Sequence, residues 1–491
     1  MIDVRNRAHS QRSLAKSVDW WLVASYILLV LIGWINIYAS VHTGYNENVS
    51  IFDLSERSGM QMLWIGISSV FAVLILFVLP PRLYESVSVP LYCFVVALLV
   101  IVIFVSSDVK GSHSWFDFGP VKFQPAEISK ITTSLLLATF MSRYSFKMSN
   151  MRDFILSAAI ILVPMLIIVL EDETGSALVY IGFIFMMYRE GLSGWVLIFF
   201  FAIIALFILT LVVSPYAAIL TAMAAVVIGN CLNSGKIKTL LTTCLPVMIL
   251  LILWPIVHDK VLETNPESFL VNIKKEYVLI PFIVFLIPYL GVKAIREKDN
   301  FKLLSVPALV VGIILAVSVD FVFENVLKDY QRGRIEYLLG MSTDTAGVGY
   351  NVNQSMIAIG SGGFWGKGYL QGTQNTGGFV PEQSTDFIFC TIGEEWGFVG
   401  CFIVICLYVF LIWRIIASAE KSREAFTRIY GYCIAGIFFM HLFINVGMTI
   451  GLMPVIGIPL PMISYGGSSL LSFTIMLFIF IALDHNENKY F

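Results

Sequence analysis

The chain has 491 residues, of which 58% are hydrophobic and only 13% charged, and its mean hydropathy is +0.84. Ordinary soluble domains carry about 25% charged residues, so this composition argues against a soluble enzyme. The formal net charge of −2 gives no reason to expect a nucleic-acid partner. The seven cysteines form no C-x-x-C pair, which favours a role as small apolar packing residues.

Apolar runs recur along the whole chain, and about fourteen of them are long enough to cross a hydrocarbon core about 30 Å thick. They predict an all-α polytopic membrane protein, a helix bundle that forms a single transmembrane domain over residues 1–491. The predicted spans are 20–41, 60–79, 88–107, 127–142, 154–170, 175–188, 195–213, 216–233, 240–257, 279–295, 304–322, 386–413, 430–451 and 463–483.

The placement of basic residues predicts the orientation. With the N-terminus inside, about twenty of the 31 Lys and Arg residues fall in cytoplasmic segments and about ten outside. This bias follows the positive-inside rule and, with an even number of spans, predicts that both termini are cytoplasmic. Most of the outside cations lie in two long loops, 258–278 and 323–385. We therefore expect the function to reside in these loops.

The start of the fourth predicted span carries charges in apolar surroundings. Pro125 favours a helix start, and Glu127 and Lys130 share one helix face, where they can pair. Charged side chains in a membrane segment are kept for a partner or a function. A structural ion pair and a functional role for Gln124, Glu127 and Lys130 both stay open. Trp115, shortly before them, is typical of an anchor at the membrane interface.

The longest non-apolar stretch, 323–385, is predicted to be a functional loop rather than a disordered linker, because aromatic residues anchor it. Arg332 and Arg334 near its start are suited to phosphate, since guanidinium groups bind oxyanions with two parallel hydrogen bonds. The glycine-rich segment at 360–368 does not complete a Walker motif, because Ser361 and Gly368 occupy required Gly and Ser/Thr positions. No nucleotide or organic cofactor is expected.

Asp386 lies at the end of this loop, directly before a long apolar helix. Either Thr385 or Asp386 is expected to cap that helix. A carboxylate at a half-buried helix entry, facing a loop that carries Arg and Lys, is also placed to act as a general base. Both roles for Asp386 stay open at this point.

These separated strings resemble, in this order, the family of shape, elongation, division and sporulation (SEDS) proteins, which are polytopic peptidoglycan polymerases. The strings are Trp115 with Gln124-Pro-Ala-Glu127-x-x-Lys130, Tyr330-Gln-Arg-Gly-Arg334, Ala358-Ile-Gly-Ser-Gly-Gly363, Pro381-Glu-x-x-Thr-Asp386-Phe-Ile-Phe389 and Gly451-x-x-Pro454-x-x-Gly457-Ile-Pro459-Leu-Pro461-x-x-Ser464-Tyr-Gly-Gly467. Gly366-Lys367-Gly368 and Gly372-Thr-Gln374 are more similar to the elongation polymerases of the family than to its division polymerases. The resemblance covers a SEDS-like core at 1–190 and 304–491.

The resemblance implies a peptidoglycan glycosyltransferase that polymerises lipid II, a disaccharide-pentapeptide on undecaprenyl pyrophosphate, during cell elongation. Asp386 is implied to be catalytic. The residues implied to bind the substrate are Trp115, Gln124, Glu127, Lys130, Arg332, Arg334, Lys367, Gln374 and Glu382. A divalent cation, Mg²⁺ or Mn²⁺, is a candidate for assisting the pyrophosphate leaving group, without assigned ligands. The implied partners are a class B penicillin-binding protein and other elongation proteins of the bacterial cytoplasmic membrane.

The sequence also departs from the family pattern. Ser384 replaces the usual His two residues before the aspartate, and Ser114 replaces a common Arg. The acidic turn at 171–173, which is either a solvated loop or a functional cluster, replaces a Gln-Pro-Asp-Leu-Gly-Thr turn. About four extra spans interrupt the core at about 195–303, an even number that keeps the loop 323–385 outside. A lipid II flippase and a non-catalytic scaffold for a penicillin-binding protein are the alternative functions.

Overall fold

The structure, a computed structural model, describes residues 18–42, 50–106, 114–117, 122–235, 244–264, 275–297, 300–325, 327–342, 347 and 349–490. Within these ranges the chain is all-α apart from one antiparallel pair of short strands, β1 (Phe116–Asp117) and β2 (Lys122–Phe123). It divides into two compact units. We call Met1–Leu192 with Thr343–Phe491 the core unit, and Ser193–Ser342 the inserted unit.

Eleven helices in the described ranges are long and apolar enough to cross a membrane. In the core unit they are α2 (Trp20–Val41), α3 (Arg57–Phe77), α4 (Pro81–Val105), α6 (Met151–Leu170), α18 (Ile388–Lys421), α19 (Ala425–Thr449) and α20 (Gly467–Tyr490). In the inserted unit they are α9 (Gly194–Val212), α10 (Pro215–Asn233), α13 (Leu279–Glu297) and α14 (Asn300–Asn325). The predicted class is confirmed, whereas the number of spans and the side of the termini stay predictions.

Three predicted spans take other forms. Span 127–142 is α5 (Pro125–Met141), and span 175–188 is broken into α7 (Thr174–Val179), the 3₁₀ turn η2 (Tyr180–Gly182) and α8 (Phe183–Arg189). Span 240–257 corresponds to α12 (Leu245–Thr264), which the 3₁₀ turn η5 (Lys275–Val278) follows. The predicted loop 323–385 contains short helices, namely α15 (Asp329–Leu338), α16 (Tyr350–Gly362) and α17 (Thr373–Thr376).

Helix α19 lies at the centre of the core unit. It packs against α5, α18 and α20. In its most apolar stretch of 18 residues, 83% of the residues are buried. Its middle approaches η2 so closely that a Cβ built on Gly436 would lie 2.5 Å from the carbonyl oxygen of Gly182. Small residues permit such contacts between membrane helices. The two glycines therefore allow α19 to pack backbone against backbone in the bundle.

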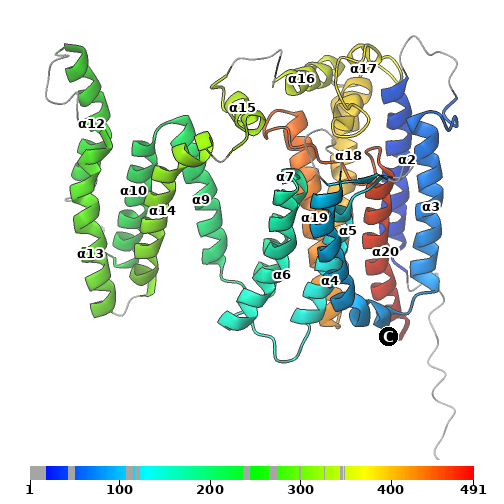
Figure 1. Cartoon of the computed structure of the whole chain (residues 1–491), viewed down its shortest axis with the longest axis horizontal. Coiled ribbons are helices and arrows are strands. Elements are labelled where there is room, and N and C mark those ends of the chain that lie inside the picture. The colour runs from blue at the N-terminus through cyan, green and yellow to red at the C-terminus, as the bar shows by residue number, and fades with distance from the viewer. Residues whose placement is uncertain are drawn as a thin grey trace, which may run out of the picture. The chain divides into compact units, whose positions relative to one another are not determined.

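The short helices α16 and α17 lie at the end of the core unit where α18 begins (Figure 1). Both helices contact α18, and α17 also contacts α2. The segment between α17 and α18, which contains Asp386, is therefore placed at one end of the helix bundle.

The inserted unit has its own apolar core, in which α14 packs against α9, α10 and α13. Tyr216 on α10 donates a hydrogen bond to the carbonyl of Leu251 on α12, at 2.6 Å. Asn230 on α10 donates to the hydroxyl of Ser305 on α14, at 3.0 Å. Polar side chains thus join the helices of this unit in pairs, as expected where lipid supplies no hydrogen bonds.

We predict that Gly436→Ala destabilises the core unit. The added methyl group would press on the backbone of η2, and such overpacking costs about 1–3 kcal/mol of the free energy of unfolding. Gly66→Ala in α3 is the matched control, because a Cβ at that position meets nothing within 4 Å. Thermal unfolding in detergent measures both variants, and an equal midpoint for the two would contradict the close α19–η2 contact.

Candidate active site

Asp386 lies in the turn 381–387, and its side chain is half-buried. The turn is built on Glu382, whose φ of 51° is in the left-handed region and whose carbonyl accepts hydrogen bonds from the Thr385 and Phe387 amides. Thr385 also donates its hydroxyl to the Glu382 carboxylate at 3.2 Å. The predicted cap at Thr385 or Asp386 is wrong, because the turn extends to Phe387, which is the N-cap of α18.

Two other segments hold this turn in place. Asn445 on α19 donates to the carbonyl of Asp386 at 2.8 Å. In the C-terminal motif, the amide of Tyr465 donates to the carbonyl of Ser384 at 2.8 Å. Gly457, with φ of +76°, lies beside the carboxylate of Asp386, since a Cβ there would be 3.3 Å from Asp386 Oδ2. The motif around 457–467 and α19 therefore fix the position of Asp386.

The predicted pair of Glu127 and Lys130 forms in α5. Lys130 Nζ lies 2.8 Å from Glu127 Oε1 and 2.9 Å from His441 Nε2, and Lys130 is 0% exposed. Because an ammonium group has no acceptor, Nε2 accepts and His441 donates its Nδ1–H to the carbonyl of Pro459, at 3.1 Å. Gln124 is the buried N-cap residue of the same helix.

The Lys130 pair and the Asp386 turn meet on one face of α19. His441 and Asn445 are four residues apart, so they lie one above the other on that face. His441 contacts the carbonyl of Pro459, and Asn445 contacts the neighbouring carbonyl of Ile458 at 2.7 Å. The ion pair of α5 is thereby connected through α19 to the turn that carries Asp386.

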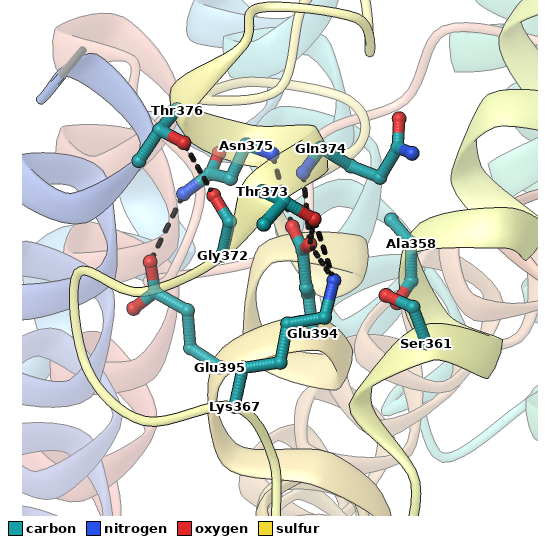
Figure 2. Close-up of polar contacts among 10 residues, drawn as sticks. All are labelled: Ala358, Ser361, Lys367, Gly372, Thr373, Gln374, Asn375, Thr376, Glu394 and Glu395. Carbon is teal, nitrogen blue, oxygen red and sulfur yellow. Dashed lines mark hydrogen bonds and ion pairs between the residues drawn. The ribbon is translucent and has the colours of Figure 1, made fainter. Parts of the chain in front are cut away.

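Lys367 is held by a carboxylate that the sequence analysis missed (Figure 2). Its Nζ lies 2.7 Å from Glu394 Oε1, and Glu394 on α18 is 0% exposed. The same carboxylate accepts hydrogen bonds from the amides of Gln374 and Asn375, at 2.8 and 2.9 Å. Thr373 donates its hydroxyl to Glu394 at 3.3 Å. Glu394 therefore ties the segment 367–375 to α18, and the charge of Lys367 is compensated.

The structure also places two further predicted substrate-binding residues, Gln374 and Trp115. Gln374 binds Glu394 through its amide backbone, while its side chain points away from Glu394 (Figure 2). Trp115 is half-buried beside Ser114, which donates its hydroxyl to Glu173 at 3.0 Å. Thus two of the departures from the family pattern, Ser114 and the acidic turn, contact each other.

The acidic turn is not a solvated loop. Glu171 is 0% exposed, and among the described residues neither of its carboxylate oxygens has a hydrogen-bond partner. Burial, together with the nearby charge of Glu173, raises the pKa of Glu171 to about 8. Burial also raises the pKa of Glu173.

Arg332 and Arg334 lie in α15 of the inserted unit. Arg332 pairs with Glu336 at 2.9 Å and lies over the ring of Phe323. Arg334 lies 5.4 Å from the ring centroid of Tyr330. Their predicted contact with substrate stays a prediction.

Comparison with known proteins shows the family to which the chain belongs. The model of the FtsW/RodA/SpoVE family, described as cell cycle protein, matches residues 19–226 and 301–489. The chain belongs to the FtsW/RodA/SpoVE family. The resemblance drawn from the motifs is confirmed, since this family is that of the SEDS proteins. The family model leaves 227–300 unmatched, and the predicted boundaries of the extra helices at about 195–303 stay a prediction.

Relatives within the FtsW/RodA/SpoVE family cover most of the chain. The peptidoglycan glycosyltransferase RodA of Treponema pallidum is 29% identical over 462 residues, which are 92% of this chain and 94% of that protein. The peptidoglycan glycosyltransferase MrdB of Escherichia coli K12 is 29% identical over 80% of this chain and 76% of that protein.

Solved structures confirm the fold of the family. A chain from a study titled "Structural coordination of polymerization and crosslinking by a peptidoglycan synthase complex" has a TM-score of 0.58 at 21% identity, covering 96% of this chain and 98% of that chain. RodA of Thermus thermophilus has a TM-score of 0.53 at 20% identity, covering 96% and 97%.

Several residues of the site were not predicted from the sequence. Glu394, His441 and Asn445 lie in apolar runs, so the rule that polar groups in membrane helices are kept for a partner could have found them. Arg57, which donates a hydrogen bond to the Ser384 hydroxyl, is one of about ten basic residues that the sequence predicts to lie outside. The local pattern around Arg57 carries no signal of this contact.

We predict that Glu394→Gln destabilises the protein, because it leaves Lys367 without a counter-charge in a largely buried position. Breaking a buried pair costs about 3–5 kcal/mol of the free energy of unfolding. Glu420→Gln is the matched control, since the Glu420–Arg189 pair is 2.7 Å long but its side chains are 42% and 49% exposed. Such exposed pairs contribute about 0–1 kcal/mol. Equal unfolding midpoints in detergent for the two variants would contradict the role of Glu394.

A second prediction concerns pH. The pKa of Glu171 in the folded protein, about 8, lies above its ordinary value, so the folded state holds the proton more tightly than the unfolded state. Stability is then lost as pH rises towards 8, by up to about 1.4 kcal/mol per pH unit. Glu171→Gln cannot ionise, so its unfolding midpoint should fall less between pH 6 and 8. Parallel pH profiles for wild type and variant would contradict this.

Proposed function

We propose that the chain is a peptidoglycan glycosyltransferase that polymerises lipid II into glycan strands during cell elongation and cell-shape maintenance. Relatives that align over most of the chain bear the names peptidoglycan glycosyltransferase RodA and MrdB. The observation that carries the proposal is the position of Asp386. It is held in a defined turn at the end of the bundle by α19 and the C-terminal motif of the family.

Asp386 acts in this proposal as the general base. Its carboxylate takes the proton from the 4-hydroxyl of the acceptor sugar. The hydroxyl oxygen forms a bond to the anomeric carbon of the donor, and the bond from that carbon to the pyrophosphate oxygen breaks. Undecaprenyl pyrophosphate leaves with the electron pair. The half-buried position of Asp386 suits this role, because the carboxylate can reach a substrate while the surrounding turn keeps it oriented.

The predicted cations have a positioning role in this scheme. Lys130 and Lys367 are each paired with a buried carboxylate, Glu127 and Glu394. Each pair is close to neutral, so it adds little net positive charge for a leaving pyrophosphate. The pairs instead order α5 and the segment 367–375 around the turn of Asp386.

The predicted divalent cation has no ligand set in the described parts of the chain. No three or more His, Cys, Asp or Glu side chains there form a group that could hold a metal ion. A role of Mg²⁺ or Mn²⁺ therefore stays a prediction, and no step of the reaction is derived through a metal.

The chain is a multi-pass membrane protein, and we place it in the bacterial cytoplasmic membrane, where lipid II is made. A solved relative comes from a peptidoglycan synthase complex in which polymerization and crosslinking are coordinated. This supports a class B penicillin-binding protein as the crosslinking partner of the present chain, together with other elongation proteins. A lipid II flippase and a non-catalytic scaffold are the alternatives that the following experiment separates.

The test is polymerisation of lipid II by the purified protein with its class B partner. The wild type should form glycan strands on a gel. Asp386→Asn should lower the rate by about 10²–10⁴-fold, because general-base catalysis contributes about that factor. Asp53→Asn is the matched control, since Asp53 is an exposed carboxylate that binds its own loop through Ser55.

The outcomes separate the readings. Strands from wild type and Asp53→Asn, but not from Asp386→Asn, support the proposal. Equal strands from all three proteins would overturn the assignment of Asp386. An absence of strands with the wild type would overturn the polymerase and favour the flippase or the scaffold.

A further inference from the structure

Arg57, the first residue of α3, reaches the turn that carries Asp386. Its guanidinium group donates a hydrogen bond to the hydroxyl of Ser384, two residues before Asp386. It also lies 5.7 Å from the ring centroid of Tyr465, whose amide donates to the carbonyl of Ser384 at 2.8 Å. We call Arg57, Ser384 and Tyr465 the arginine cluster. It joins α3, the Asp386 turn and the C-terminal motif at one place.

The charge of Arg57 has no carboxylate partner in the described part of the chain. Among the residues that the structure describes, Arg57 forms no ion pair, and its side chain is exposed. Lys130 and Lys367 differ from it, because each lies within 2.8 Å of a buried carboxylate oxygen. Of these three cations, only Arg57 combines proximity to the Asp386 turn with an uncompensated charge.

The chemistry of this arrangement fits a phosphate group. A guanidinium group has five N–H donors in a rigid plane, and the Ser384 hydroxyl uses one of them. The remaining donors can bind phosphate oxygens with two parallel hydrogen bonds. Arg57 also stands at the N-terminus of a helix of 21 residues, where the aligned peptide dipoles add positive potential.

We propose that Arg57 binds the pyrophosphate of the lipid-linked donor beside Asp386. This inference rests on the proposed function, and it names the group that meets the leaving pyrophosphate. As the bond from the anomeric carbon to the pyrophosphate oxygen breaks, negative charge grows on that oxygen, and Arg57 stabilises it. The hydroxyl of Ser384 and the ring of Tyr465 orient the guanidinium plane. Ser384 thus acts as a positioning residue for Arg57.

Direct binding tests the proposal without relying on polymerisation. Undecaprenyl pyrophosphate is titrated into the full-length protein in a detergent free of phospholipid. Arg57→Ala should weaken binding by about tenfold or more, since hydrogen bonds to charged groups contribute about 1.5–3 kcal/mol. Arg57→Lys should retain part of the affinity as a point charge. Arg152→Ala, at an exposed residue at the start of α6, is the matched control and should bind like the wild type.

Kinetics separate binding of the donor from a structural role. Arg57→Ala should raise the apparent KM for lipid II or lower kcat while the unfolding midpoint stays close to that of the wild type. Raising the salt concentration should weaken binding by the wild type more than by Arg57→Ala, because an ionic contact is screened. Ser384→Ala should have a smaller effect than Arg57→Ala, since it keeps the charge.

Specific outcomes would overturn the inference. Equal affinity of wild type and Arg57→Ala for undecaprenyl pyrophosphate would remove Arg57 from the site. Equal losses in Ser384→Ala and Arg57→Ala would show that the contact only holds the turn. A change seen only when phospholipid is added would assign Arg57 to bilayer headgroups. If the wild type makes no strands but loses pyrophosphate binding on Arg57→Ala, the polymerase proposal fails and the pyrophosphate site stands.

Discussion

The site depends on two buried polar side chains of α19. His441 and Asn445 lie one turn apart on α19, and both are 0% exposed, so their polar groups need partners within the protein. They bind neighbouring carbonyls of the segment 457–461, and each then reaches one further group, Lys130 or the carbonyl of Asp386. A buried polar group without a hydrogen-bond partner would cost free energy. One face of α19 therefore binds three segments, namely α5, the C-terminal motif and the Asp386 turn.

A second anchor, Glu394, works by a different principle. Its buried carboxylate needs several donors, and these are Lys367, Thr373 and two backbone amides of α17. Bonds to a charged acceptor are about twice as strong as neutral ones. A short helix such as α17 is not stable by itself, and the carboxylate supplies the missing stabilisation at its N-terminal amides. The two anchors therefore fix the two sides of the segment that ends at Asp386.

The parts of this fold that could be predicted from the sequence are those governed by local rules. Apolar length predicts the spans, and three-residue spacing predicts the Glu127–Lys130 pair, which forms. The contacts of Lys130 with His441 and of Arg57 with Ser384 join residues 311 and 327 positions apart, and no local pattern encodes them. For the same reason the sequence gives no sign of the partner of Lys367, which was implied to bind the substrate, because that partner, Glu394, is buried in a helix further along the chain.

The compensated charges bear on how the proposed site would bind an anionic pyrophosphate. A cation can be buried in apolar surroundings when a carboxylate pairs with it, but the pair has little net charge with which to bind an anion. A cation that is to meet an incoming phosphate has to keep its charge unmatched, and this is tolerated only where water reaches it. The pairs of α5 and α18 therefore suit the task of holding segments in place, and the proposed stabilisation of a leaving group is left to an exposed cation beside the turn 381–387. At that turn the buried hydroxyl of Ser384 stands where the family usually has an imidazole, and it accepts a hydrogen bond from the guanidinium group of Arg57 on α3. A positive charge is thus supplied next to the Asp386 turn from a different helix.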